Sequence, residues 1–416
     1  MGGGPGARPT LSPPAPGLPG CHDDRGTLVG FELVRVSVPL AAPWRSAAGT
    51  FSHRDTMLVR AVLRFPGAGP GGGAGEVEGW GECPALPGPT FSAEYTAGAQ
   101  DVSERYLVPA LLRDGVACIG AVGPALAGVK GHNMAKTAFE AAVLDAELKA
   151  GGVRAADFLC GQSRCRAVAA EGVMAGVAIG LTRSVSELLD EVALRCEEGY
   201  RRVKLKVRPG WDVEPVRAVR ERWPALVLFA DANGAYGHLP VGEAAEQLAR
   251  LDSYELSCLE QPLADDDLAG HGELARRLRT PLCLDEALSS PAAIVNALRA
   301  GACSVVNIKA GRLGGYLEAV RAHDICAEQQ VPVWCGGMVE TGIARAANLA
   351  LASLPGFSLP GDLSATGRFF ETDLAGPMPL RPDGTIAVPV GPGGGVLVDH
   401  EAIGRFSTSR TWWTPR

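Results

Sequence analysis

The sequence predicts an α/β fold in which a closed (β/α)7β barrel of the TIM type carries an α+β capping domain. The chain has 416 residues, more than one ordinary hydrophobic core accommodates. From about residue 167 onward, short apolar runs alternate with amphipathic helical stretches, as is typical of βαβ units around a parallel sheet. Charged residues follow several of these apolar runs, at the position where barrel enzymes place their active sites.

The segments outside the barrel have other patterns. Residues 1–26 are rich in glycine and proline and lack the apolar core of a signal peptide, so we expect a disordered tail. Strand-like runs follow, and a helix-like stretch, NMAKTAFEAAVLDAELKA, precedes the barrel. The C-terminal tail is strand-like again. We therefore assign residues 27–150 together with 378–416 to the capping domain, and residues 151–377 to the barrel.

Eight apolar runs define the predicted barrel strands. Eight strands favour a closed barrel over an open doubly wound sheet. None of the runs is followed by GxGxxG, which argues against a dinucleotide-binding fold. In chain order the runs are VMAGVAIGL, RVKLKV, LVLFADAN, LSCLEQP, PLCLDEA, SVVNIKAG, VPVWCGG and FSLPGD.

Composition and charge argue against several classes of partner. The net charge of −7 comes without acidic runs, and no basic patch indicates binding to nucleic acid or to a membrane surface. No apolar stretch reaches the roughly 18 residues that span a bilayer. The 11 cysteines are scattered without a CxxC pair, which fits a reducing cytoplasm. The histidines lack the close spacing of a zinc site, so any metal would be held by oxygen atoms.

Five charged residues fall at or near the ends of five successive predicted strands. Each residue alone has a simpler explanation, since an aspartate after a strand is commonly a helix cap. Three carboxylates converging on one barrel mouth would repel one another unless a cation lay among them. Oxygen ligands of this kind suit Mg²⁺, with Mn²⁺ as a substitute, and a network of salt bridges with the lysines is the alternative. The five residues are Lys206, Asp231, Glu260, Asp285 and Lys309.

The run RVKLKV places Lys204 and Lys206 on the same face of one strand. One interpretation is an edge strand with a solvated lysine face. The other is a catalytic strand at which a proton next to a carboxylate is removed, because a divalent cation stabilises the resulting enediolate and a lysine serves as base. In that case Lys204 would favour the neutral, proton-accepting form of Lys206.

These motifs together resemble the enolase superfamily, muconate-lactonizing subgroup. The likeness rests on KLK at 204–206, DAN at 231–233, EQP at 260–262, DE at 285–286 and KAGRLGG at 309–315. Further stretches, such as GHNMAKTAFEAAVLDAEL and LPGDLSATGRFFETDL, resemble the branch of o-succinylbenzoate synthases and N-succinylamino acid (N-acylamino acid) racemases. The resemblance implies Mg²⁺ ligands at Asp231, Glu260 and Asp285. It also implies an acid/base at Lys206, with Lys309 on the opposite face of the substrate.

The resemblance also implies a substrate cavity beneath two loops of the capping domain, at residues 42–55 and 83–92. Asn233 and Glu286 would support the neighbouring metal ligands. The side chains expected to line the substrate cavity are Phe51, Pro89, Phe91, Trp334, Met338, Asp362 and Leu363.

Two reactions fit these residues. We favour o-succinylbenzoate synthase, which dehydrates 2-succinyl-6-hydroxy-2,4-cyclohexadiene-1-carboxylate to 2-succinylbenzoate in menaquinone biosynthesis, because this branch is chiefly named for it. The N-succinylamino acid racemase reaction, with the same two lysines, is the alternative. A dipeptide epimerase would carry DxD after the eighth strand, where this chain has GDLS. The partner is a small-molecule carboxylate, and a homo-oligomer is expected.

Overall fold

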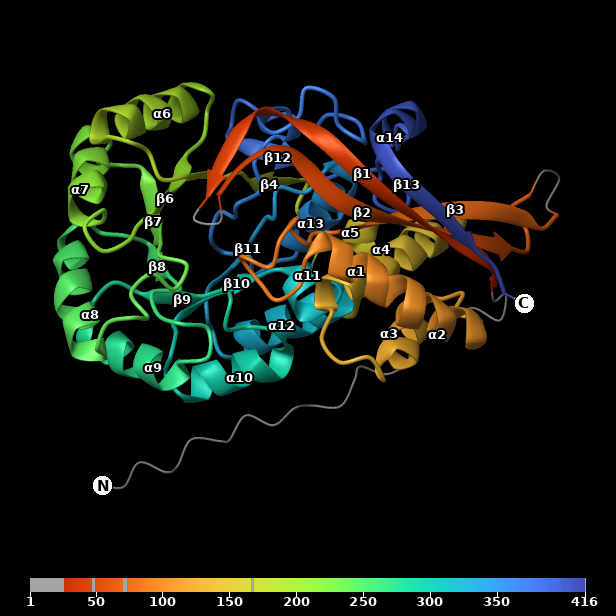
Figure 1. The fold of residues 1–416 in the computed structure, drawn as a ribbon, viewed down its shortest axis with the longest axis horizontal. Coiled ribbons are helices and arrows are strands. Elements are labelled where there is room, and N and C mark those ends of the chain that lie inside the picture. Colours follow the sequence, from red (N-terminus) through yellow and green to blue (C-terminus); the bar gives the residue numbers. More distant parts are fainter. Residues whose placement is uncertain (1–25, 47–48, 70–72, 166–167, 416) are drawn as a thin grey trace.

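The computed structural model describes residues 26–46, 49–69, 73–165 and 168–415. The disordered tail expected at residues 1–26 lies outside these ranges except for its last residue. Figure 1 shows two parts in contact, a curled array of strands ringed by helices and an antiparallel sheet packed on further helices. The predicted combination of a (β/α) barrel and an α+β cap is confirmed.

The cap is built on a four-stranded antiparallel sheet in the order β13-β1-β2-β3. Its apolar face packs on helix α4 (Asn133–Ala150). Gly79 and Gly81 permit a close approach, because a Cβ atom at either position would overlap the backbone of α4. The strands are β1 (Thr27–Ser46), β2 (Gly49–Phe65), β3 (Gly75–Cys83) and β13 (Ser407–Trp413).

Short helices complete the cap beside α4. The chain from residue 96 to 113 is helical with a π-helical turn in its middle. These elements are α1 (Thr96–Val102), η2 (Ser103–Leu107), α2 (Val108–Arg113), α3 (Ile119–Leu126) and, near the C-terminus, α14 (His400–Phe406).

The barrel strands pair in parallel and in sequence order, from β5 to β11. The eighth predicted run, FSLPGD, forms no regular strand, but it lies beside β11. Leu359 N–H donates to the Val333 carbonyl oxygen, and Asp362 N–H donates to that of Cys335. On its other side Gly361 approaches Gly176 so closely that a Cβ atom there would overlap the Gly361 carbonyl. The strands are β5 (Val177–Ile179), β6 (Arg202–Lys206), β7 (Val227–Asp231), β8 (Cys258–Glu260), β9 (Leu282–Leu284), β10 (Val305–Ile308) and β11 (Val333–Cys335).

The barrel helices cover the outside of the strands (Figure 1). Side-chain caps fix where several of them begin: the Ser184 and Ser290 hydroxyls accept from the N–H groups of Glu187 and Ala293. The helices are α5 (Ala155–Gln162), α6 (Val185–Glu197), α7 (Val213–Arg222), α8 (Val241–Leu248), η3 (Ala249–Ser253), α9 (Leu268–Arg277), α10 (Pro291–Arg299), α11 (Ala310–Leu313), α12 (Tyr316–Glu328), α13 (Gly342–Ala352) and η4 (Thr366–Arg368).

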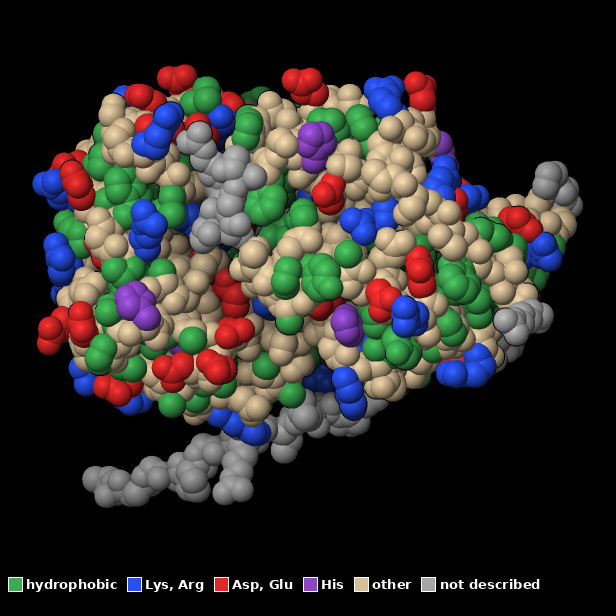
Figure 2. Space-filling view, in the orientation of Figure 1, with side chains coloured by type: hydrophobic (Ala, Val, Ile, Leu, Met, Phe, Trp, Pro, Cys, Tyr) green, Lys and Arg blue, Asp and Glu red, His purple; other side chains and the backbone are tan. Residues whose placement is uncertain are grey.

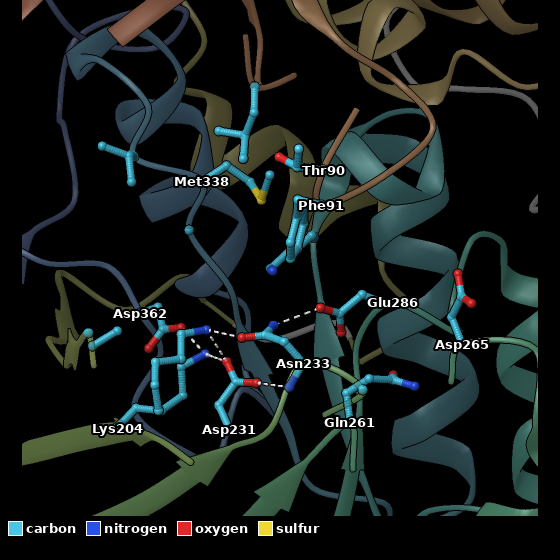
Figure 3. A pocket seen from close by; sticks show the side chains of 18 of the residues that line it. Thr90, Phe91, Lys204, Asp231, Asn233, Gln261, Asp265, Glu286, Met338 and Asp362 are labelled. Atoms are coloured by element: carbon cyan, nitrogen blue, oxygen red, sulfur yellow. Dashed lines mark hydrogen bonds and ion pairs between the residues drawn. The ribbon is translucent and has the colours of Figure 1, made fainter. Parts of the chain in front are cut away.

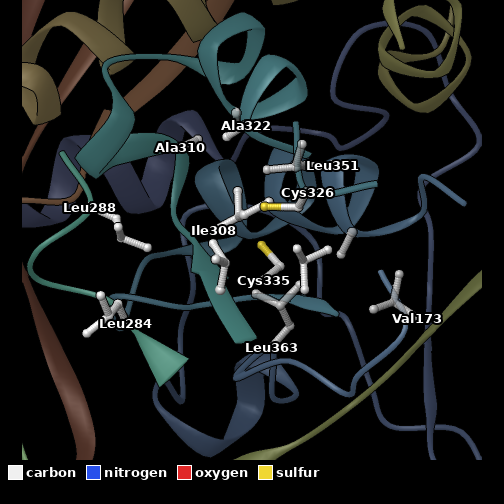
Figure 4. Close-up of a cluster of buried hydrophobic side chains, with 14 of the residues drawn as sticks. Val173, Leu284, Leu288, Ile308, Ala310, Ala322, Cys326, Cys335, Leu351 and Leu363 are labelled. Atoms are coloured by element: carbon white, nitrogen blue, oxygen red, sulfur yellow. The ribbon is translucent and has the colours of Figure 1, made fainter. Parts of the chain in front are cut away.

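The main hydrophobic core lies between the barrel strands and their helices. Figure 4 shows part of it, where Ile308 of β10 and Cys335 of β11 meet Leu351 of α13. A smaller cluster, formed by Phe229, Cys258, Cys283, Val305 and Trp334, packs separately from that core. Successive strand residues point to opposite sides, so each strand contributes to both environments.

The C-terminal tail is shared between the two parts. β12 (Thr385–Ala387) pairs with β4 (Gly172–Met174), and Ile386 belongs to the barrel's core cluster, whereas β13 completes the cap sheet. Because the tail contributes to both parts, the assignment of all of residues 378–416 to the cap stays a prediction. Within the described residues, no helix combines the length and the apolar character that crossing a membrane requires. On the face drawn in Figure 2, acidic and basic side chains are interspersed.

Candidate active site

The five predicted strand-end residues lie at the mouth of the barrel, and strand register explains how three of them meet. Lys206 stands directly opposite Asp231 in the pairing of β6 with β7, and Asp231 stands opposite Glu260 in the next pair. The Lys206 ammonium donates to Asp231 Oδ2 over 2.7 Å. Across the mouth, the Lys309 ammonium donates to Asp285 Oδ2 over 2.6 Å. Each lysine therefore has its own carboxylate.

Lys204 lies deeper in the same strand, with 3% of its surface exposed. Its ammonium contacts three carboxylates, at 3.0 Å from Asp231, 2.7 Å from Glu260 and 2.5 Å from Asp362. Burial alone would lower the pKa of Lys204, but these carboxylates raise it well above its usual value. The alternative of an edge strand with a solvated lysine face is wrong, because β6 is flanked by β5 and β7 and Lys204 is buried.

Asp362 and Arg202 extend this charged network into the barrel. The fully buried Arg202 guanidinium donates to Asp362 Oδ1. Its Cζ atom lies 4.0 Å from the centroid of the Phe229 ring and 4.9 Å from that of Trp334. Asp362 is one of the residues expected to line the substrate cavity. The structure shows that Asp362 lines the cavity and also joins Lys204 to Arg202.

The carboxylate donor set fits a divalent cation. Burial, together with the neighbouring Asp231 charge, raises the pKa of Glu260 to about 8, so a cation nearby would favour its ionised form. Asp285 Oδ1 and Glu286 Oε2 are buried without a hydrogen-bond partner among the described residues. Asp285 Oδ1 has only an ion-pair contact, 3.2 Å from Arg312 Nε. These oxygen atoms have the chemistry that Mg²⁺ prefers.

The carboxylate oxygen atoms of Asp231, Glu260 and Asp285 do not converge on one point in this structure. In the part of the chain that the structure describes, the group of potential metal ligands found within 4.8 Å of one another is a different one, Cys165, His323 and Asp324. The ammonium groups of Lys204 and Lys309 lie against the oxygen atoms of Asp231, Glu260 and Asp285 instead. An incoming cation would therefore replace some of these lysine contacts.

Asn233 connects the two halves of the mouth. Its side-chain oxygen accepts from the Lys206 ammonium over 2.5 Å, and its amide nitrogen donates to Glu286 Oε1 over 2.7 Å. Its φ angle of 43° lies in the left-handed region that asparagine tolerates better than most residues. The structure therefore places Asn233 and Glu286 beside the carboxylates, as expected for supporting residues.

A cavity of about 340 Å³ opens above these groups. Figure 3 shows Phe91 and Met338 over the charged floor formed by Lys204, Asp231 and Asn233. The Lys309 ammonium lies 5.0 Å from the centroid of the Phe91 ring, within the range of a cation–π contact. The loop at 83–92 thus covers the mouth as expected and contributes the lining residues Leu86, Thr90 and Phe91.

Four of the predicted cavity residues lie elsewhere. Trp334 is fully buried, because its side chain joins Phe229 in the separate cluster, and Leu363 points into the core shown in Figure 4. Asp362 and Leu363 are adjacent, so only one of them faces the cavity. Pro89 is exposed and Phe51 is half-buried in β2, and neither lines the cavity.

Several lining residues carried no clear sequence signal. Gln261 follows Glu260 in EQP, and its side-chain oxygen accepts from the Asp285 N–H over 3.1 Å. Arg345 is the fourth residue of α13 and Arg368 ends the short 3-10 helix η4, so no periodic pattern marks either of them. Both nevertheless line the cavity.

Comparisons with known proteins show the family to which the chain belongs. Residues 187–402 match the family model described as Enolase C-terminal domain-like. An N-succinylamino acid racemase of Amycolatopsis sp is 50% identical over 386 residues, which cover 92% of this chain and 99% of the relative. An o-succinylbenzoate synthase of Geobacillus kaustophilus is 38% identical, over 90% of this chain and 94% of the relative.

A solved structure is similar throughout. The crystal structure of an enolase superfamily member from Listeria innocua superposes with a TM-score of 0.84 at 32% identity, covering 94% of this chain and 100% of that one. The family model spans more than half of this chain, and the relatives match it nearly end to end. This chain therefore belongs to the enolase superfamily.

Proposed function

We propose that this chain is an o-succinylbenzoate synthase, and the racemisation of N-succinylamino acids by the same two lysines is the alternative. The observation that carries the proposal is the pairing of two lysines with two carboxylates, Lys206 with Asp231 and Lys309 with Asp285, at one cavity. Such an arrangement suits removal of a proton from a carbon next to a carboxylate, with one lysine on each side of that carbon. Relatives with both names support the proposal.

Asp231, Glu260 and Asp285 would hold Mg²⁺. The ion would supply positive charge beside the carboxylate oxygens of the substrate as the carbon loses its proton. Lys204, shared among Asp231, Glu260 and Asp362, would keep these carboxylates in place and add a second positive charge.

In the dehydration, neutral Lys206 takes the proton from the carbon next to the substrate carboxylate. The electron pair of that C–H bond enters the ring, the C–O bond to the hydroxyl group breaks, and Lys206 returns its proton to the leaving oxygen as water. Lys309 remains an ammonium group, held by Asp285 and placed against Phe91, and faces the other side of the ring. Phe91 and Met338 exclude water from above.

The racemase reaction is the second candidate, and two observations favour it. The racemase of Amycolatopsis sp shares half of its residues with this chain. The Lys309–Asp285 contact also mirrors the Lys206–Asp231 contact, so either lysine is placed to give or take a proton. One lysine would remove the α-proton of an N-succinylamino acid and the other would deliver a proton to the opposite face.

The proposal is tested by assaying both substrates with protein stripped by EDTA and then restored with Mg²⁺ or Mn²⁺. We expect both activities to disappear without metal and to return with it. Activity that persists in metal-free protein would contradict the carboxylate assignment. Brisk racemisation without measurable dehydration would make the racemase the principal function, and the absence of both reactions would refute the proposal.

We also propose that the chain works in the cytoplasm as a homo-oligomer. The described cysteines are all unpaired, as a reducing compartment would leave them. Light scattering on purified protein checks the oligomer, and a monomer at micromolar concentration would contradict it.

A further inference from the structure

Arg368 gives the cavity a positive group from a part of the chain that follows all the barrel strands. It ends η4, after the eighth barrel segment, and lines the cavity beside Ala178 of β5 and Gly180, which follows that strand. Its Nη2 atom donates to the Ala178 carbonyl oxygen over 2.7 Å, and its Cζ atom lies 5.1 Å from the centroid of the Phe369 ring. These contacts hold the half-buried guanidinium in position.

The other arginines of the site each have a carboxylate partner. Arg202 pairs with Asp362, Arg312 with Asp285, and Arg345 with Glu340.

Arg368 has no such partner: among the described residues, no carboxylate oxygen lies within 4.0 Å of its guanidinium nitrogens. The acidic residues near it, Glu191 on α6 and Glu198 directly after that helix, are engaged by Arg195 at 3.1 and 2.7 Å. Burial, and then the charge of Arg195, lower the pKa of Arg368, so its surroundings disfavour the cation. A guanidinium in such a place is stabilised when a ligand brings an anion to it.

The charges around the cavity indicate where a second anion would go. Lys206 and Lys309 already contact carboxylates, and Arg345 is 1% exposed and paired. Asp265, on the loop after β8, is exposed at the rim and would repel an anion there (Figure 3). β8 is three strands away from β5 in the barrel sheet, so the acidic rim and Arg368 lie on different sides of the cavity.

We propose that Arg368 binds the carboxylate at the far end of the substrate's succinyl group and thereby selects dicarboxylate substrates over those with an uncharged acyl chain. This inference rests on the proposed function for the reacting end of the substrate. The planar guanidinium offers two parallel N–H donors to a carboxylate, which an ammonium group cannot reproduce. The reacting carboxylate would lie between Lys206 and Lys309, and the distal one at the Arg368 guanidinium beside β5.

Two ligands that differ only at the distal end test the inference without turnover. Isothermal titration with Mg²⁺ present would compare 2-succinylbenzoate with 2-butanoylbenzoate, in which a methyl group replaces the distal carboxylate. We expect the wild-type chain to bind 2-succinylbenzoate about ten- to a hundredfold more tightly. Arg368→Met should remove this preference by weakening only the succinyl ligand, and Arg368→Lys should restore part of it.

Arg217→Met is the matched control, since Arg217 is exposed on α7 outside the cavity and its loss also removes one positive charge. It should leave both affinities unchanged. Equal affinity of the wild-type chain for the two ligands would overturn the inference, as would an equal loss for both ligands in Arg368→Met. Neither result bears on the proposed reaction, which fails only if the wild-type chain turns over neither substrate.

Discussion

At the scale of single residues, Lys204 and Arg202 show how the barrel tolerates charge in its interior. Each contacts a carboxylate on another strand or segment, and Arg202 is additionally enclosed by the rings of Phe229 and Trp334. Asp362 contacts both cations, and together they lower its pKa although burial would raise it. The doubled lysine of β6 is therefore explained by the acidic groups that face it.

Replacement of Arg202 tests this network. Arg202→Met leaves Asp362 buried with one cation fewer, so we expect the free energy of unfolding to fall by about 3–5 kcal/mol. In the double variant Arg202→Met/Asp362→Asn, residue 362 no longer carries an unpaired negative charge. Part of the lost free energy of unfolding should therefore be recovered. Urea unfolding of wild type and of the variants measures both values. A loss below about 1 kcal/mol for the single variant would show that the ion pair matters little.

At the scale of elements, the contact of β3 with α4 depends on glycine. A Cβ atom at Gly81 would overlap the Ala138 carbonyl oxygen, which belongs to a helix backbone and cannot move aside. Gly81→Ala should therefore lower the free energy of unfolding by about 1–3 kcal/mol. Gly123 of α3 has open space around it, so Gly123→Ala should be neutral or stabilising by up to about 1 kcal/mol. Similar losses in the two variants would contradict the packing argument.

Helix α4 also connects the cap to the barrel through Glu140. This buried carboxylate accepts from the Leu317 N–H over 3.0 Å at the beginning of α12. Burial raises the pKa of Glu140 from 4.5 to about 7, against the lowering effect of the backbone hydrogen bonds. The folded protein therefore binds this proton more tightly than the unfolded chain does. Its stabilising contribution is complete below about pH 4.5 and is lost as the pH rises through about 7.

Glu140→Gln removes this titration and keeps the size of the side chain. The stability of wild type relative to this variant should fall between pH 4.5 and pH 7, by about 3 kcal/mol. Thermal or urea unfolding at several pH values provides the comparison, with Glu318 and Arg321, which also act on Glu140, left unchanged. A difference that stays constant over this range would contradict the assignment.

At the scale of the whole molecule, the sequence predicted the features that repeat. Lys206, Asp231, Glu260, Asp285 and Lys309 could be placed because each follows an apolar run of the same kind, and parallel strands bring their ends together. Strand periodicity also predicted that Lys204 shares a face with Lys206.

The features that could not be predicted depend on particular side-chain directions in irregular segments. Whether Asp362 or Leu363 faces the cavity is decided by the backbone of the eighth segment, which has no regular strand geometry. Trp334 was expected at the mouth, yet it packs against both Phe229 and the Arg202 guanidinium. Arg368 lies in the stretch LPGDLSATGRFFETDL, but its direction into the cavity depends on the short helix η4, which the sequence pattern does not predict.

The central claim, that Lys206 and Lys309 lie on opposite faces of the reacting carbon in both proposed reactions, is tested most directly by proton exchange. The α-proton of each enantiomer of an N-succinylamino acid would be followed by NMR in deuterated water with Mg²⁺. We predict that Lys206→Ala stops exchange for one enantiomer only, that Lys309→Ala stops it for the other, and that either change ends interconversion. If Lys206→Ala left the exchange of both enantiomers near the wild-type rate, β6 would not be the catalytic strand and the claim would be contradicted.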